Sequence, residues 1–239
     1  MGKMIISTGS TRYWTLTVVQ RMLGALSVLW AWAMSRFVDY IEECQSDRIN
    51  PHQVVVVGHS RGGKTALWAA AQDERIAMAV SNNSGCTGAS LARHEAVGAE
   101  TIKQINSRFP HWFCRNYRRY NGNVEALPVD QHILLALLAP RALYVASATH
   151  DFWADPTGEY LATCQASSVW TNVYGENAAT AFVPSTGSTP KVDTPIQSMH
   201  FKVNYHIRMG EHDLCLFDWC RYIDTAKNLF ANSPPTIEE

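Results

Sequence analysis

Apolar residues recur along this chain at two spacings, which predict strands and helices in alternation. Short apolar runs rich in β-branched residues predict strands at 54–57, 76–81, 141–148, 169–174 and 203–208. Apolar residues three or four positions apart predict helices at 22–43, 65–71, 89–106, 130–138, 159–167 and 214–230. Strands that alternate with helices are typical of an α/β fold with a mostly parallel sheet.

The composition bounds the domain organisation. A chain of 239 residues, 46% of them hydrophobic, can bury one sizeable core, so we expect a single domain over residues 1–239. Three segments depart from the regular pattern: an atypical N-terminus at 1–20, an internal surface loop at 175–200 and a tail at 231–239. The loop contains a run, 183–195, that is rich in Pro, Ser, Thr and Gly.

Charge and cysteine spacing argue against several classes of partner. The net charge of −1 provides no general field for nucleic acid or for an acidic membrane surface, so we expect neither partner. The six cysteines and nine histidines lack zinc-type spacing, and we expect no metal or other cofactor. We interpret the cysteines as buried free thiols, with disulfides as the alternative if the protein is exported.

An uncharged stretch at 22–35 follows Lys3, Arg12 and Arg21 and resembles an export signal at first sight. It is too short to span a bilayer, and it continues without a small-residue cleavage pattern into helical periodicity at 36–43. We interpret 22–43 as a helix packed against the sheet. The sequence therefore predicts no transmembrane segment and no intact signal peptide.

The strongest chemical signal lies where the four valines at 54–57 run into Gly-His-Ser-Arg-Gly at 58–62. A glycine two positions before and two after Ser60 permits a sharp turn from strand to helix, which exposes the serine hydroxyl at the helix N-terminus. The backbone amide of Arg61 can face an oxyanion there. We interpret Ser60 as a catalytic nucleophile; the alternative is an ordinary helix N-cap.

Serine hydrolases with an α/β-hydrolase fold carry nucleophile, acid and histidine in that order, each after a strand. His212 follows the strand at 203–208 and fits the last role, whereas His206 inside that strand is interpreted as structural. Two loops could supply the acid. One holds Asn83, whose amide cannot stabilise an imidazolium. The other holds Asp151, the preferred candidate, and Asp155, which precedes Pro156 and is typical of a helix N-cap.

Several further motifs resemble one family, the glucuronoyl esterases of carbohydrate esterase family 15, and especially its bacterial members. The runs are GHSRGGKTALW, SNNSGCTGA, FPHWFC, LPVDQH, APRALYVASA and DFWADP, and the resemblance covers about residues 24–230. It implies an α/β-hydrolase fold and a metal-free serine esterase that cleaves the ester between 4-O-methyl-glucuronic acid on xylan and an alcohol of lignin. It also implies a secreted or periplasmic protein.

Carried over to this sequence, the resemblance makes Ser60 the nucleophile and His212 the general base, and the guanidinium of Arg61 helps to hold the oxyanion. A cation beside a developing alkoxide stabilises charge that the ground-state ester lacks. The alternative for Arg61 is a surface arginine.

The resemblance also implies a sugar pocket. Lys64 lies one helical turn beyond Ser60 and can donate to sugar hydroxyls, and Trp153 matches an indole that contacts the uronate ring. Glu100 matches an acidic sugar-binding position with local spacing that differs by one residue, which leaves Glu95 as a rival. Without the resemblance, Trp153 could equally fill the core, and either glutamate could be a solvated surface residue.

The chain also departs from the family pattern. Fungal members have a glutamate where this chain has Asn83, and the choice of Asp151 as the acid follows the bacterial variant. The fungal disulfide cannot form, because its two positions are His59 and Asp213 here. Only about fifty residues precede the nucleophile strand, so the N-terminal strands of the fold are expected to be partly missing, with one sheet edge exposed.

Three functions remain open at the level of sequence. The leading one is a serine esterase acting on glucuronate esters of lignocellulose. The second is another serine hydrolase, such as an acetyl xylan esterase or a peptidase. The third is a catalytically silent fragment or a carbohydrate-binding derivative.

Overall fold

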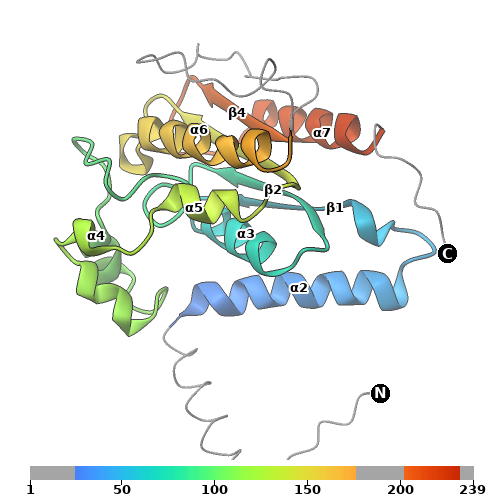
Figure 1. The fold of residues 1–239 in the computed structure, drawn as a ribbon, viewed down its shortest axis with the longest axis horizontal. Helices are drawn as coiled ribbons and strands as arrows, with labels where there is room; N and C mark the ends of the chain where they lie inside the picture. The colour runs from blue at the N-terminus through green and yellow to red at the C-terminus, as the bar shows by residue number, and fades with distance from the viewer. Residues whose placement is uncertain (1–24, 176–201, 232–239) are drawn as a thin grey trace, which may run out of the picture.

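A parallel sheet forms the centre of the part of the chain that is described, residues 25–175 and 202–231 of a computed structural model (Figure 1). Its strands are β1 (Val54–His59), β2 (Ile76–Asn82), β3 (Ala142–Ala148) and β4 (Val203–Arg208), in that order across the sheet. Each neighbouring pair is parallel. The carboxyl ends of the strands therefore share one edge of the sheet, where an α/β fold places its ligand.

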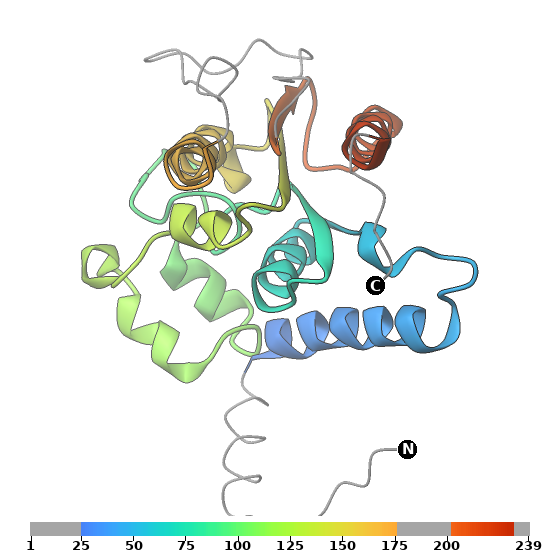
Figure 2. The same ribbon diagram turned by 45° about the vertical axis from the view of Figure 1, so that its right-hand side comes forward.

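Helices cover both faces of this sheet (Figure 2). On one face lies α7 (Leu216–Ala231), whose Tyr222 packs with Met78 and Tyr144 of the strands. On the other lie α3 (Arg61–Gln72) and α6 (Pro156–Asn172), where Leu67 and Trp170 are fully buried. The three-layer α/β fold predicted from the sequence is confirmed.

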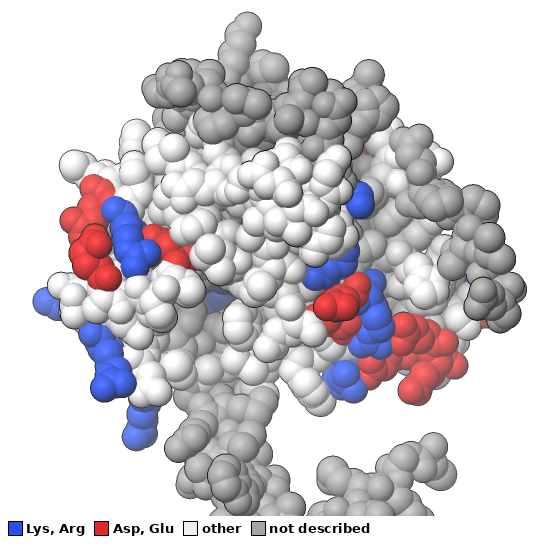
Figure 3. Space-filling model, in the orientation of Figure 1, with Lys and Arg blue, Asp and Glu red and all other residues white. Residues whose placement is uncertain are grey.

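The remaining described elements are α2 (Leu26–Cys44), α4 (Ile102–Arg108), α5 (Gln131–Ala136) and the 3-10 helices η1 (Pro51–Gln53), η2 (Arg115–Tyr120), η3 (Val124–Ala126) and η4 (Phe152–Ala154). α2 packs against α3 and buries Val38. Arg75, between α3 and β2, links α2 to the sheet, because its guanidinium forms ion pairs with Asp39 and Glu42 of α2. Figure 3 shows acidic and basic side chains side by side there.

Two predicted elements are wrong. The helix expected at 89–106 forms only from residue 102, because side chains take the amides that a helix would use: Asp130 accepts from the amides of residues 92 and 93. A capping box at Thr101 then starts α4. The strand expected at 169–174 is the end of α6, which buries Trp170 and lets its indole donate to the carbonyl of Arg141 at 2.9 Å.

Other predictions are confirmed or lie outside the described residues. The strands at 76–81 and 203–208 and the helices at 130–138 and 214–230 form within a few residues of their predicted limits. The segments at 1–20 and 183–195 are not among the described residues. No helix in the described ranges has the length and apolar character needed to cross a membrane.

Within the described residues, β1 and β4 are the two edge strands of the sheet, and β1 is the less buried of them. β1 pairs with β2 on one side only, and its four valines are half-buried. The exposed edge expected from the short N-terminal part stays a prediction, because residues 1–24 are not among the described ones. All six cysteines are free thiols; Cys86 and Cys164 are buried as predicted, whereas Cys44, Cys114 and Cys220 are exposed.

Candidate active site

Ser60 forms the turn between β1 and α3. Its backbone has φ 55° and ψ −121°, a conformation that costs energy in any residue with a side chain. Its amide donates to the carbonyl of Asn82 at 2.8 Å, and its carbonyl accepts from Gly63 at 3.0 Å. The strand, the sharp turn at Ser60 and the helix predicted from the sequence are confirmed.

The glycines around this turn have different roles. A side chain on Gly58 would collide with the carbonyl of Gly62, so Gly58 is required. Gly62 itself has open space around it, so of the two glycines expected to permit the turn, Gly58 is the one whose missing side chain the packing requires. Gly63, which sequence reasoning passed over, lies against Ser84, whose Cβ would be 2.9 Å from a side-chain carbon at that position.

Asp151 and His212 are brought together at the carboxyl edge of the sheet. Oδ2 of Asp151 lies 2.6 Å from Nδ1 of His212 and also accepts from the amide of Asn83 at 2.7 Å. The ring of His212 lies 4.5 Å from the ring of His59, between centroids, which places it beside the turn that carries Ser60. With Nδ1 donating to the carboxylate, Nε2 of His212 is an acceptor for a serine proton.

This pairing changes the acid–base properties of both groups. Burial raises the pKa of Asp151, but hydrogen bonds from His212 and Asn83 outweigh it, so the pKa of this carboxyl lies below its ordinary value. The hydrogen bond to Asp151 raises the pKa of His212 above that of free imidazole, against a smaller opposing effect of burial. A carboxylate that stabilises an imidazolium is what a general base needs.

The two rival positions for the acid have other roles. Asp155 caps α6: Oδ1 accepts from the amide of Gly158 at 2.9 Å, while Oδ2 accepts from Ser90 and contacts His94. The N-cap predicted from Asp155 and Pro156 is thus confirmed. Asn83, which was set aside because an amide cannot be the acid, has φ 47° and donates to Asp151. Sequence reasoning missed this supporting role.

A buried glutamate fixes the loop that follows β2. Glu159 of α6 is fully buried and accepts from the amides of Ser84 and Gly85, at 2.8 and 2.9 Å, and from the hydroxyl of Ser147 at 2.6 Å. Burial raises its pKa to about 7 despite these bonds. Because Ser84 directly follows Asn83, Glu159 also fixes the backbone from which Asn83 reaches Asp151.

Three of the predicted sugar-binding residues lie near one another. Glu100 and Trp153 are joined twice: the amide of Glu100 donates to the carbonyl of Trp153 at 3.0 Å, and the Glu100 side chain is hydrogen-bonded to Trp153. Burial raises the pKa of Glu100, and the nearby Lys64 opposes this. Glu95 is exposed and has neither contact, so the geometry favours Glu100.

Lys64 is buried, which sequence reasoning did not foresee. Its ammonium donates to the carbonyls of Ser84 and Cys86, and burial lowers its pKa. An ammonium carries three hydrogens, so these two bonds leave one for another acceptor.

The side chain of Arg61 is held by aromatic rings. Its guanidinium carbon lies 4.7 Å from the ring centre of Trp30 in α2 and 5.4 Å from that of Trp112. Such contacts are worth about 0.5–1 kcal/mol each when exposed. They fix the guanidinium beside the first turn of α3, and no sequence spacing could have linked these three residues.

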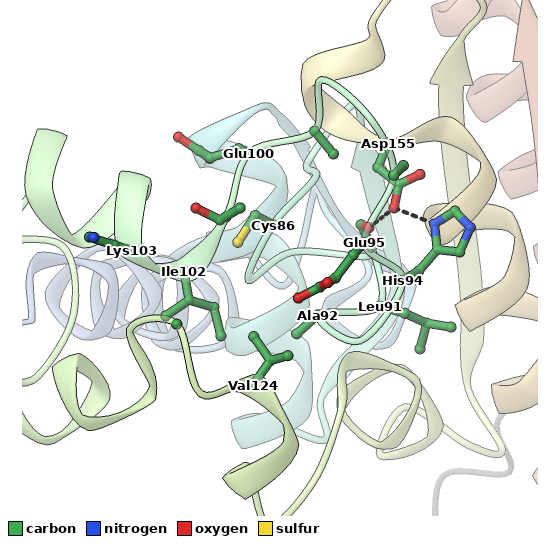
Figure 4. A pocket seen from close by; sticks show the side chains of 15 residues that line it. Cys86, Leu91, Ala92, His94, Glu95, Glu100, Ile102, Lys103, Val124 and Asp155 are labelled. Atoms are coloured by element: carbon green, nitrogen blue, oxygen red, sulfur yellow. Dashed lines mark hydrogen bonds and ion pairs between the residues drawn. The ribbon is translucent and has the colours of Figure 1, made fainter.

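A cavity of about 340 Å³ adjoins Glu100 (Figure 4). Figure 4 shows Cys86 between Lys103 on one side and His94 with Asp155 on the other. Among the described residues, its lining includes neither Ser60 nor His212. It is therefore a neighbour of the candidate catalytic group and not its centre. The described residues contain no cluster of three side chains suited to hold a metal ion.

Comparison with known proteins agrees with this geometry. The family described as "Glucuronyl esterase, fungi" matches residues 3–174. Carbohydrate esterase MZ0003, from an unknown prokaryotic organism, is 43% identical over 82% of this chain and 43% of its own length. The 4-O-methyl-glucuronoyl methylesterase 1 of Phanerochaete chrysosporium is 36% identical over 53% of this chain and 28% of its own length.

A solved structure supports the same relationship. The glucuronoyl esterase from Solibacter usitatus superposes with a TM-score of 0.75 and 41% identity, over 86% of this chain and 49% of that one. The chain thus spans about half the length, or less, of the proteins that it resembles. With most of its length matched by the family and the strand–serine–helix turn in place, the chain belongs to the glucuronyl esterase family.

Proposed function

We propose that this chain is a serine carboxylesterase that hydrolyses esters of glucuronic acid or its 4-O-methyl derivative, as in the lignin–carbohydrate linkages of glucuronoxylan. The observation that carries the proposal is the hydrogen bond between Asp151 and His212 beside the strained turn of Ser60. The related protein named a 4-O-methyl-glucuronoyl methylesterase supports the substrate class. Export from the cell, which the family resemblance implies, stays a prediction.

The proposed reaction has two half-reactions. Nε2 of His212 takes the proton of Ser60, whose Oγ attacks the C6 carbonyl carbon of the uronate ester. The alcohol then leaves with the proton from His212, and a covalent acyl-enzyme remains. In the second half, His212 removes a proton from water, the resulting hydroxide attacks the acyl carbon, and the bond to Oγ breaks as Ser60 regains its proton.

Arg61 is proposed to hold the developing oxyanion through its backbone amide at the start of α3, with its guanidinium adding positive charge nearby. Its stacking on Trp30 and Trp112 supports this role, because a held cation needs little reorganisation when charge develops.

The sugar is proposed to lie among Lys64, Glu100 and Trp153. The remaining hydrogen of the Lys64 ammonium and the Glu100 carboxylate can bond sugar hydroxyls, and the partly exposed indole of Trp153 can contact the pyranose ring. A purely apolar ester would use none of these polar groups. The arrangement therefore favours a uronate over a simple alkyl ester.

Hydrolysis of methyl and benzyl glucuronate by the purified chain tests the proposal. Ser60→Ala should abolish turnover. The matched control is Ser90→Ala, because the Ser90 hydroxyl also bonds an aspartate near a histidine but lies outside the candidate catalytic group. Ser90→Ala should keep the wild-type kcat.

Other outcomes would select the alternatives. Turnover of acetylated xylose but not of methyl glucuronate, dependent on Ser60, would indicate a different serine hydrolase. Failure of a fluorophosphonate to label Ser60 in folded protein would indicate a catalytically silent or carbohydrate-binding chain.

A further inference from the structure

The segment that carries His212 has little regular structure of its own. Residues 209–215 lie between β4 and α7 and form neither strand nor helix, and the side chain of His212 is 42% exposed. Backbone hydrogen bonds hold the two ends of this segment: the amide of His150 donates to the carbonyl of Gly210 at 2.8 Å, and the amide of Trp219 donates to that of Cys215 at 3.2 Å. Some other group must hold the backbone at His212 itself, since Nδ1 keeps a 2.6 Å contact with Asp151.

Arg208, the last residue of β4, provides that contact. Its side chain turns back under the loop, and Nη2 donates to the carbonyl of Glu211 at 2.9 Å and to that of Asp213 at 2.6 Å. These two carbonyls belong to the residues directly before and after His212. One buried guanidinium thus holds the backbone on both sides of the candidate general base.

Asp218, in the first turn of α7, fixes the guanidinium in turn. Asp218 is fully buried, and its Oδ2 accepts from Nε of Arg208 at 3.0 Å and from the amide of Cys215 at 2.9 Å. Its Oδ1 lies 2.8 Å from Nε2 of His206, whose Nδ1 contacts the hydroxyl of Tyr144 in β3. A chain of hydrogen bonds therefore runs from the middle of the sheet to the loop.

Gly210 provides independent evidence that the loop is fitted to this guanidinium. A side-chain carbon at Gly210 would lie 2.6 Å from Nη1 of Arg208, closer than a carbon and a nitrogen can approach without displacement. The φ of Gly210 is 133°, which other residues rarely adopt. The backbone therefore passes close to the guanidinium, and a side chain at this position would have to displace the guanidinium or the loop.

We propose that Arg208 is a positioning residue for the reaction, which holds the backbone of His212 so that its imidazole stays on Asp151 and faces Ser60. This inference rests on the proposed function. Arg208 touches neither substrate nor reacting atoms. A lysine cannot replace it, because the planar guanidinium bonds four acceptors in fixed directions, the fourth being the carbonyl of Met209 at 3.4 Å, whereas an ammonium is a single point of charge.

Arg208→Lys tests the proposal. We expect kcat on methyl glucuronate to fall about 10²-fold with KM within about twofold, since a displaced general base slows chemistry without touching the sugar pocket. We also expect the wild-type chain to show a sharp NMR resonance for the His212 Nδ1 proton, because that proton is held on Asp151, and we expect this resonance to broaden or disappear in the variant. Arg141→Lys is the matched control, because Arg141 likewise donates to backbone carbonyls, those of Asp73, Ile76 and Leu137, but lies just before β3, away from the carboxyl ends of the strands.

The outcomes separate this inference from the proposed function. If the wild-type chain fails to hydrolyse the ester, the proposed function fails, and the His212 resonance alone decides the role of Arg208. If folded Arg208→Lys keeps the resonance and a kcat within about threefold of wild type, Arg208 has only a stabilising role and the proposal is overturned. If Arg208→Lys does not fold, Asp218→Asn, which keeps the guanidinium but weakens its anchor, replaces it with the same criteria.

Discussion

Replacement of Asp151 by Asn tests the candidate proton relay most directly, because it changes one oxygen to an NH2 group and leaves the shape unchanged. In the wild-type site, Oδ2 of Asp151 accepts from two donors, Nδ1 of His212 and the amide of Asn83. Oδ1 accepts from the backbone amide of Ala154 at 3.2 Å. Both oxygens therefore face donors only.

An asparagine at this position cannot satisfy these donors. If its oxygen takes the place of Oδ2, its NH2 group faces the N–H of Ala154. That N–H keeps its second acceptor, the backbone carbonyl of residue 151 at 3.1 Å, so the new NH2 group is the buried donor that goes unpaired. If the amide is flipped, the NH2 group faces Nδ1 of His212, and the imidazole must move its proton to Nε2. That tautomer cannot accept the proton of Ser60. We therefore expect kcat to fall by about 10³–10⁴-fold, the loss that a wrong histidine tautomer causes in serine hydrolases.

The assay is kcat and KM on methyl glucuronate, with circular dichroism to show that the variant is folded. Asp155→Asn is the matched control, because Asp155 also pairs with a histidine, His94, but caps α6 away from His212. Asparagine is a good N-cap, so this control should fold and keep its kcat within about threefold. Folded Asp151→Asn with a kcat above about one tenth of wild type would refute the assignment of Asp151 as the acid.

Four further predictions follow. Asn83→Ala should lower kcat about tenfold in a steady-state assay, because the Asp151 carboxylate loses a donor that favours its charged form. The acidic limb of a kcat/KM–pH profile should lie above pH 6.5, since the hydrogen bond to Asp151 raises the pKa of His212 and only the neutral base is active. The free energy of unfolding of the wild-type chain should fall by on the order of 3 kcal/mol as pH rises from 4.5 to about 7, because Glu159 keeps its proton over this range in the folded chain and loses it in the unfolded chain. Urea titrations should show that Glu159→Gln lacks this fall. Leu67→Ala should lower the free energy of unfolding by about 3 kcal/mol in the same titrations, because Leu67 is fully buried in the core between α3 and the sheet.

Much of the fold could be predicted from the sequence because strand and helix periodicities differ. Apolar runs marked β2 and β4, and the Asp155–Pro156 pair marked the start of α6. The prediction failed at 89–106, where tertiary hydrogen bonds to Asp130 decide the backbone. It also failed at 169–174, where Trp170 has high strand propensity but completes the buried side of a helix.

The candidate site was predictable where a residue directly follows a strand. Ser60 and Asp151 carry local signals, a Gly-flanked serine and an aspartate after an apolar run. The supporting residues carry none: Asn83 reaches Asp151 across 68 positions, and Glu159 reaches Ser84 across 75. Such contacts depend on the order of strands across the sheet, which no spacing along the chain encodes.

The chain contains a second set of the same residue types, and the contrast shows that connectivity, not composition, defines a relay. Ser90, Asp155 and His94 are hydrogen-bonded together beside the cavity. Both the hydroxyl of Ser90 and Nδ1 of His94 contact the same oxygen of Asp155, so serine and histidine lie in parallel on the carboxylate. A hydroxyl that donates to a carboxylate has its proton directed away from the imidazole, and the histidine cannot activate it. Among the described residues, the side chain of Asp151 contacts His212 and Asn83 but no serine hydroxyl. The proton of Ser60 is therefore left for Nε2 of His212.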